Sequence, residues 1–277
     1  MKTVLTIAGS DSIGGAGIQA DIKTITMNGA YAMSAVTALT AQNTRGVTEI
    51  LEAPPEFVEE QIDAVFKDIK PDAIKTGMVG SEDIICAVAN QLKARRVKNL
   101  VVDPVMVSTS GAKLMPKKAI AVLKEQLIPL ATLVTPNIPE AEVISGIKIF
   151  SYNDLVKSAK AIAKKCGCPV LIKGGHRIEG ADDILFVDGK IIKFTGERID
   201  NPNTHGTGCT LSAAIATNLA KGFDLVSAVE WAKDYVTNAI AANLNLGKGN
   251  GPIQHSFDLD SVYACDWRGY KKMKGIK

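Results

Sequence analysis

Net charge, cysteine and long apolar runs are all scarce in this sequence, and each shortage excludes a class of protein. The 32 basic and 29 acidic residues leave a formal charge of +3, too balanced to indicate nucleic acid or a membrane surface as a partner. The 5 cysteines are an odd number without a zinc-type CxxC pairing, which argues against a disulfide framework. No run approaches the ~20 apolar residues of a membrane-spanning helix, and the apolar stretch after Met1 is too short for a signal peptide. We therefore expect a cytoplasmic protein.

The sequence does contain enough apolar material for a large core. Hydrophobic residues make up 46% of the chain, and no linker, low-complexity block or repeat interrupts it. Folds of the α/β class are often single units at this length. We predict one domain over residues 1–277, in which the basic residues 265–277 form a solvated tail.

Apolar runs alternate with stretches of helical periodicity along most of the chain. The continuous apolar runs 100–102 and 170–172 are typical of strands in a parallel sheet that helices cover on both faces. The dipeptide Asp188-Gly189 between two further runs predicts a β-hairpin. The pattern predicts a three-layer α/β/α fold with a mostly parallel central sheet and a small hairpin. The expected strands are 3–8, 34–39, 47–51, 72–76, 99–102, 131–135 and 169–173, and the expected helices are 18–27, 55–67, 82–95, 116–127, two from 139 and 152, one after 208, and 225–246.

A glycine-spaced turn, Gly206-Thr207-Gly208-Cys209, leads into an Ala-rich run that predicts a helix. Glycine lets the backbone come close to a ligand, and the N–H groups of a first helical turn have no intrahelical partner. Such a turn is a ready site for phosphate. Cys209 falls in this first turn, where the helix dipole favours a thiolate and predicts a lowered pKa. From this segment alone, an ordinary helix start with a small buried cysteine is the alternative.

Polar or glycine-marked sequences follow four of the predicted strands. In an open parallel sheet, ligands bind beyond the carboxyl ends of the strands, so these sequences are expected to meet. The four are Gly9-Ser-Asp11, Asp103-Pro104, Thr135-Pro-Asn137 and Lys173-Gly-Gly175.

The residues at these strand ends supply the parts of a phosphoryl-transfer site. Asp103 and Glu140 carry the hard oxygens that Mg²⁺ prefers, and a Mg²⁺ site usually combines one or two carboxylates with substrate phosphates. Lys173 offers a flexible ammonium for phosphate oxygens. Together with the N–H groups of the turn 206–209, these groups could position and stabilise a transferring phosphoryl group.

The sequence lacks the familiar nucleotide-binding motifs. The glycines at 9, 15 and 17 are not followed by the Lys-Ser/Thr of a P-loop, and no G-x-G-x-x-G opens the first helix. A Walker ATPase and a Rossmann dinucleotide site are therefore poor interpretations. We expect the N-terminal glycine-rich loop to close over a small substrate instead.

Six motifs occur in order along the chain: 6–24 (TIAGSDSIGGAGIQADIKT), 75–78 (KTGM), 103–106 (DPVM), 135–140 (TPNIPE), 173–176 (KGGH) and 205–210 (HGTGCT). They resemble the hydroxymethylpyrimidine/phosphomethylpyrimidine kinase family of thiamine biosynthesis, within the ribokinase-like superfamily. The resemblance runs from about residue 3 to the last long helix. It implies ATP-dependent phosphorylation of 4-amino-5-hydroxymethyl-2-methylpyrimidine and then of its monophosphate to the diphosphate. It also implies a homodimer.

The resemblance assigns roles to individual residues. Gln42 matches the pyrimidine-contacting glutamine, and an amide suits an aminopyrimidine edge because it is a donor and an acceptor together. Ile13 is a departure, since the family usually has serine there. The expected pocket residues are Gly9, Asp11, Ala16, Gln42, Met78 and Val105; the expected ATP- or phosphate-binding residues are Asp103, Asn137, Lys173 and Thr207; the expected Mg²⁺ ligands are Asp103 and Glu140; and the expected catalytic residues are Gly206, Thr207, Gly208 and Cys209.

Cys209 occupies the position at which most ribokinase-like enzymes have an aspartate general base. We predict that Cys209 takes the proton of the substrate hydroxyl while the amides of residues 206–209 stabilise the transferring phosphoryl group.

Three alternatives remain at this point. A pyridoxal or pyridoxine kinase of the same family would replace the Ala-Gln-Asn-Thr stretch that contains Gln42. A cysteine hydrolase would use Cys209 as nucleophile and His205 as base, but no third group is evident to orient His205. A non-catalytic pyrimidine binder would have no use for Asp103 and Lys173.

Overall fold

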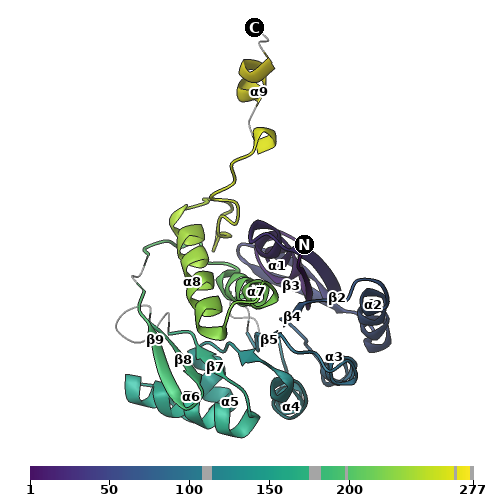
Figure 1. Cartoon of the computed structure of the whole chain (residues 1–277), viewed down its shortest axis with the longest axis vertical. Helices are drawn as coiled ribbons and strands as arrows, with labels where there is room; N and C mark the ends of the chain where they lie inside the picture. Colours follow the sequence, from purple (N-terminus) through teal and green to yellow (C-terminus); the bar gives the residue numbers. More distant parts are fainter. Residues whose placement is uncertain (108–113, 175–181, 197–198, 265–266, 275–277) are drawn as a thin grey trace.

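The computed structural model describes residues 1–107, 114–174, 182–196, 199–264 and 267–274. Gly175 and His176 of the motif 173–176 lie outside these ranges, as does Cys265 of the predicted tail. The described chain forms one sheet between two layers of helices (Figure 1). This arrangement confirms the predicted three-layer α/β/α fold.

The sheet runs in the order β3-β2-β1-β4-β5-β6-β7-β8-β9 across the described residues. The six central strands, β2, β1, β4, β5, β6 and β7, are parallel to one another. At one edge β3 pairs antiparallel with β2, and at the other edge β8 and β9 form an antiparallel hairpin. Asp188 and Gly189 both have positive φ, 49° and 75°, as the predicted hairpin turn requires. The strands are β1 Thr3–Asp11, β2 Tyr31–Asn43, β3 Gly46–Glu52, β4 Ala73–Thr76, β5 Leu100–Val102, β6 Leu133–Val134, β7 Val170–Ile172, β8 Asp183–Val187 and β9 Lys190–Phe194.

Helices cover both faces of this sheet and bury two separate cores (Figure 1). Successive strand residues point to opposite faces, so in β1 Leu5 and Ile7 join one core and Val4 joins the other. Within the described ranges no helix has the length and apolarity to cross a membrane. The first core lies under α2 Pro55–Asp68, α3 Glu82–Ala94, α4 Lys117–Val122, α5 Ile138–Ser145 and α6 Tyr152–Cys166, and the second under α1 Gly17–Met27, α7 Thr207–Ala220 and α8 Leu225–Ala241.

Three helical segments differ from the prediction. The expected helix 116–127 is α only over 117–122, then widens to a π turn at 123–127 and tightens to a 3₁₀ turn around Pro129, whose ring cannot continue a helix. Helix α8 ends at Ala241 rather than at Leu246, because Asn243 takes a φ of 49°. The predicted tail contains a short helix, α9 Trp267–Lys274, which stands apart from the rest of the chain in Figure 1.

A charged pair lies fully buried between the sheet and α1. Nζ of Lys75 on β4 donates hydrogen bonds to both carboxylate oxygens of Asp21, at 2.8 and 3.0 Å, and both side chains are 0% exposed. Thr6, the register partner of Lys75 on β1, donates its hydroxyl hydrogen to the same carboxylate at 2.5 Å. The buried Asp21 carboxylate therefore has hydrogen-bond donors from both Lys75 and Thr6, as a buried charge requires.

We predict that Lys75→Met lowers the free energy of unfolding by about 3–5 kcal/mol, because it leaves the Asp21 carboxylate buried and unpaired. The double variant Lys75→Met/Asp21→Asn should recover most of this loss, since no charge is then left without a partner. Lys148→Met is the control, because Lys148 pairs with Glu142 while remaining 74% exposed, and it should barely move the midpoint. Urea denaturation followed by circular dichroism measures all three. A double variant no more stable than Lys75→Met would contradict this account.

Candidate active site

The carboxyl ends of β5, β6 and β7 bring three polar side chains together. Asp103, Thr135 and Lys173 each follow directly on the last residue of one of these strands. Oδ1 of Asp103 accepts hydrogen bonds from Nζ of Lys173 at 3.0 Å and from the Thr135 hydroxyl at 3.2 Å. Burial lowers the pKa of Lys173, but the charges of Asp103 and Glu140 raise it more, so the ammonium form is favoured. A fixed positive charge therefore stands beside a buried carboxylate.

The first turn of helix α7 lies next to the Asp103–Lys173 pair. A Cβ on Gly208 would lie 3.3 Å from Nζ of Lys173 and 3.7 Å from Oδ2 of Asp103. One turn further, the hydroxyl oxygen of Ser212 lies 3.4 Å from Oδ2 of Asp103 and 3.0 Å from the carbonyl oxygens of Gly208 and Cys209. The start of the predicted phosphate-binding helix and the strand ends thus meet, as the sequence predicted.

The turn into α7 depends on glycine. Gly206 has a φ of 85°, and a Cβ there would lie 1.8 Å from the carbonyl oxygen of Gly15. The N–H of Thr207 donates to the carbonyl of Thr204 at 3.3 Å. The N–H groups of Gly208 and Cys209 fall in the first turn, where the helix offers them no carbonyl. These two are the donors that an anion above the turn would meet.

Glu140 lies in the first turn of α5. Oε2 of Glu140 accepts from the N–H of Asn137 at 2.8 Å, and Oδ1 of Asn137 accepts from the N–H of Glu140 at 2.9 Å, which is a capping box. Burial raises the pKa of Glu140 to about 7, with a further increase from the charge of Asp103 and an opposing effect from Lys173. Asn137 therefore has a structural role at the helix start, and its predicted contact with ATP stays a prediction.

The chemistry of Asp103 and Glu140 fits a magnesium ion that is shared with a substrate. Each carboxylate is at most 5% exposed, and the charge of Asp103 already disfavours ionisation of Glu140, so a divalent cation would relieve the repulsion. Among the described residues no cluster of three or more His, Cys, Asp or Glu side chains could hold a metal by itself. Two carboxylates without a third protein ligand agree with Mg²⁺ that takes its other ligands from phosphates and water.

The predicted lowering of the Cys209 pKa is wrong. Burial raises the pKa of the thiol to about 11; Lys75 lowers it, while the carboxylates of Asp21 and Asp103 raise it. Desolvation and two acidic neighbours outweigh the helix start on which the prediction relied. The resting side chain is therefore a thiol.

The N-terminal loop is held together by Asp11. The Asp11 carboxylate, 3% exposed, accepts hydrogen bonds from the N–H groups of Ile13 at 3.1 Å, Gly15 at 3.0 Å and Ala16 at 2.8 Å. Burial raises the pKa of Asp11, but the hydrogen bonds from His205 and from the Ala16 amide outweigh this and lower it below its usual value. Asp11 thus shapes the loop that carries the predicted pocket residues.

His205 belongs to the same network, which corrects one step of the sequence argument. Its Nε2 lies 2.8 Å from Oδ2 of Asp11, so a third group does orient this ring. The same nitrogen lies 3.1 Å from Nε2 of Gln42. These hydrogen bonds tie His205 to the predicted pyrimidine pocket. Finding a group that orients His205 removes one objection to the cysteine-hydrolase alternative, and the raised pKa of Cys209 is what disfavours it.

The remaining predicted pocket residues lie near this loop or near Asp103. A Cβ on Gly9 would lie 3.0 Å from Cε of Met78, which places these two residues side by side. The Cα of Ala16 would lie 3.3 Å from a Cβ on Gly206, so the loop also meets the turn that begins α7. Val105 is half-buried two residues after Asp103, and its N–H donates to the Asp103 carbonyl at 2.9 Å.

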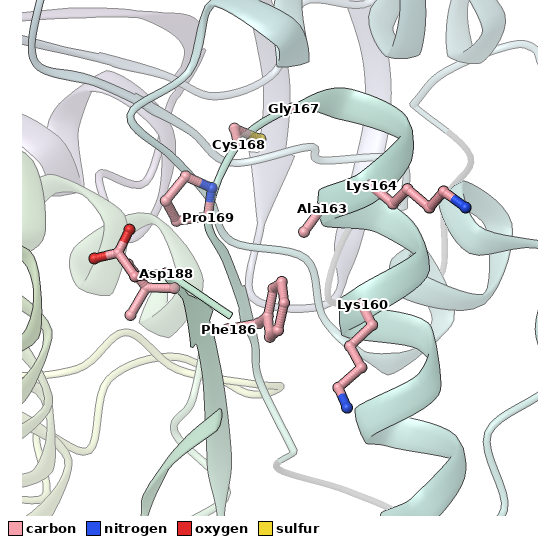
Figure 2. A pocket seen from close by; sticks show the side chains of 9 residues that line it. Lys160, Ala163, Lys164, Gly167, Cys168, Pro169, Phe186 and Asp188 are labelled. Atoms are coloured by element: carbon pink, nitrogen blue, oxygen red, sulfur yellow. The ribbon is translucent and has the colours of Figure 1, made fainter. Parts of the chain in front are cut away.

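A separate surface hollow of about 360 Å³ lies at the other end of the sheet (Figure 2). Cys168 and Pro169, at the amino end of β7, line it together with Lys160 and Lys164 of α6 and Phe186 of β8. Burial and the neighbouring Cys166 raise the pKa of Cys168 to about 12, so this thiol is inert. None of the predicted site residues lines this hollow, and it has no part in the candidate site.

Sequence reasoning missed two residues that complete the setting of Asp103. Thr135 donates a hydrogen bond to its carboxylate, and the hydroxyl of Ser212 lies 3.4 Å from it. Thr135 was visible in the strand-end motif 135–140, and Ser212 stands three residues after Cys209, on the same face of a helix. Neither position signals a hydrogen bond to Asp103 until the strand order is known.

The fold and the site define a phosphotransferase of the ribokinase-like class, in which a parallel sheet brings a lysine, carboxylates and a helix start to one edge. The model of the family described as phosphomethylpyrimidine kinase matches residues 11–254. The chain belongs to this family.

Named relatives agree with this assignment. The chain is 46% identical over 260 residues to the hydroxymethylpyrimidine/phosphomethylpyrimidine kinase of Haemophilus influenzae, covering 92% of this chain and 97% of that one. It is 51% identical over 261 residues to the thiamine biosynthesis bifunctional protein ThiED of Geobacter sulfurreducens, and here 94% of this chain spans only 53% of the relative.

Two solved structures share the fold over most of their length. Phosphomethylpyrimidine kinase from Clostridium difficile superposes with a TM-score of 0.79 at 46% identity, covering 87% of this chain and 100% of that one. An ADP complex of Bacillus subtilis pyridoxal kinase superposes with a TM-score of 0.86 at 38% identity, covering 92% and 98%. The two activities named for these neighbours are the two kinase alternatives that the sequence left open.

Proposed function

We propose that this protein is an ATP-dependent kinase that phosphorylates 4-amino-5-hydroxymethyl-2-methylpyrimidine and then its monophosphate, to give the diphosphate used in thiamine biosynthesis. The observation that carries the proposal is the contact between the Asp103–Lys173 pair and the first turn of α7. A Cβ added to Gly208 in this turn would lie only 3.3 Å from Nζ of Lys173. Catalysis of phosphoryl transfer is mostly positioning and charge stabilisation, which is what these groups offer.

Each residue has a separate task in this proposal. The ammonium of Lys173 and the N–H groups of Gly208 and Cys209 bind the oxygens of the transferring phosphoryl group. In its thiolate form, the sulfur of Cys209 accepts the proton that the substrate hydroxyl loses as its oxygen bonds to phosphorus and the terminal phosphate leaves the nucleotide. Asn137 and Thr207 line the nucleotide phosphates.

Asp103 and Glu140 would hold Mg²⁺, directly or through water. When bound, the ion supplies positive charge to the nucleotide phosphates.

The pyrimidine is favoured over pyridoxal because of Gln42. Its side chain is half-buried at the end of β2, beside the loop that contains Asp11 and Ala16. An amide can pair with an aminopyrimidine edge through one donor and one acceptor. Gly9, Met78 and Val105 would complete the pocket around the ring.

We predict ADP release when the protein is given ATP, Mg²⁺ and hydroxymethylpyrimidine, and little or none with pyridoxal as acceptor. A coupled ADP assay with the two acceptors in parallel measures this, with EDTA as the control that should stop the reaction. ADP with pyridoxal alone would favour the pyridoxal-kinase alternative. No ADP with either acceptor would favour a binding protein.

We further propose a cytoplasmic homodimer. Resemblance to the family supports the dimer, and the absence of disulfide-type cysteine spacing supports the compartment. Leu39 and Leu51 on the β2–β3 ribbon are 54% and 66% exposed, and this edge of the sheet is the surface that we expect a second copy to cover.

A further inference from the structure

His205 links the amide of Gln42 to the carboxylate of Asp11 through a single nitrogen. Nε2 of His205 lies 2.8 Å from Oδ2 of Asp11 and 3.1 Å from Nε2 of Gln42. His205 is 5% exposed and Asp11 is 3% exposed, so their partners are set by the protein. One imidazole nitrogen carries at most one hydrogen, and this limit decides which group donates in each contact.

Asp11 can only accept in this network. Its carboxylate already takes three backbone N–H groups, and its pKa is held below the usual value, so it carries no hydrogen of its own. A ring nitrogen without a hydrogen would set one lone pair against another at 2.8 Å. Nε2 of His205 therefore carries the hydrogen and donates it to Asp11.

The atom of Gln42 that faces this N–H is then its oxygen, which shares the one hydrogen with Oδ2 of Asp11 in a three-centre hydrogen bond. An amide nitrogen there would set two donors against each other at 3.1 Å. The other end of the amide leads to the same result, because the Thr40 hydroxyl, 3.3 Å away, gives its one hydrogen to the Ser10 carbonyl at 2.9 Å. Thr40 is thus left as an acceptor for the amide NH₂. Rotating the Gln42 amide by 180° exchanges its oxygen and nitrogen, which have nearly the same shape. The oxygen then faces Nε2 of His205 and the NH₂ group faces the Thr40 hydroxyl.

We propose that His205 is a positioning residue for substrate selectivity: held by Asp11, its Nε2–H turns the Gln42 oxygen toward the ring and so fixes the order of donor and acceptor that Gln42 presents to the pyrimidine. This inference rests on the proposed role of Gln42. An edge with an amino group beside a ring nitrogen matches one amide orientation with two hydrogen bonds. A ring without the amino group keeps only the one hydrogen bond to its ring nitrogen, so its binding depends less on that orientation.

The test compares the natural substrate with 5-hydroxymethyl-2-methylpyrimidine, which lacks the 4-amino group. His205→Leu should raise KM for the amino substrate about tenfold, change kcat much less, and leave the inhibition constant of the des-amino analogue within about twofold. His205→Gln should restore the difference, since its amide nitrogen can reach the place of Nε2 and supply a hydrogen to both neighbours. A parallel rise of both constants in His205→Leu, or no change in either, would overturn the proposal.

Two further variants separate this proposal from its basis. His255 is also 5% exposed and bonds to Thr210 at 3.0 Å, so His255→Leu removes an equally buried imidazole without touching Gln42 and should not change the ratio of the two constants. Gln42→Leu should raise KM as His205→Leu does, and the double variant should add little. If Gln42→Leu raises KM and His205→Leu does not, this inference fails and the proposed function stands. If Gln42→Leu has no effect, the proposed pyrimidine contact fails, and this inference with it.

Discussion

Replacing Cys209 with alanine is expected to lower kcat by about 10²–10⁴-fold while KM for the pyrimidine changes little. The thiolate form of Cys209 is the proposed acceptor of the substrate proton, so its loss removes an interaction that is made in the transition state. The alanine leaves the backbone of the turn and the Asp103–Lys173 pair in place. Steady-state rates at saturating ATP measure the effect, and an unchanged kcat would remove Cys209 from the role of base.

The pH dependence provides a second result for the same residue. Because burial raises the pKa of Cys209 to about 11, only a fraction on the order of 10⁻³ or less is thiolate near neutral pH, and kcat should increase as pH rises from 7 toward 9. Cys209→Asp should recover part of the activity with a flatter profile, since a carboxylate is ionised at lower pH. Cys209→Ala should lose this dependence. A wild-type rate independent of pH would mean that Cys209 does not act as a thiolate base.

Lys173→Met is expected to lower kcat by about 10²–10³-fold and to raise KM for ATP. The change removes the ammonium that Asp103 holds 3.0 Å away, and with it one fixed charge for the phosphate oxygens. Lys173→Arg should not restore activity, because the Lys173 side chain is only 17% exposed and its Nζ lies 3.0 Å from Oδ1 of Asp103, where the longer side chain and planar guanidinium of arginine cannot reproduce the position of a compact ammonium.

Lys193→Met is the matched control for Lys173→Met. Lys193 is also paired with an aspartate, Asp182, but it lies on the β9 hairpin and is 44% exposed. Its replacement should leave kcat and KM unchanged. Thermal unfolding of both variants shows whether the unpaired Asp103 also destabilises the protein, and a Lys173→Met enzyme that is folded and fully active would contradict the proposed phosphate contact.

The strand ends were the most predictable part of this site. Asp103 and Lys173 follow apolar runs, and the carboxyl ends of parallel strands must share one edge of the sheet, so their meeting follows from pattern and topology. The same reasoning located the turn at Gly206. The continuous apolar runs carried this information, because β5 and β7 are only three residues long and are buried on both faces.

Residues whose role depends on contacts between distant segments could not be predicted in the same way. Lys75 and Asp21 stand 54 positions apart, and no local pattern reveals that a lysine in the middle of β4 is fully buried. The pKa of Cys209 was misjudged for this reason, since the helix start is visible in sequence whereas burial beside Asp21 and Asp103 is not.

The contact between His205 and Asp11 has a consequence for synthesis of the chain. The two residues are 194 positions apart, and Thr44 likewise accepts hydrogen bonds from the N–H groups of Lys248 and Gly249, more than 200 positions later. At about 5–20 residues per second, a ribosome needs about 10–40 s to make the stretch between Asp11 and His205. During that time the N-terminal loop has no ring to bind. A chain interrupted between residues 194 and 205 would contain every strand of the described sheet and still lack His205 and the turn that begins α7.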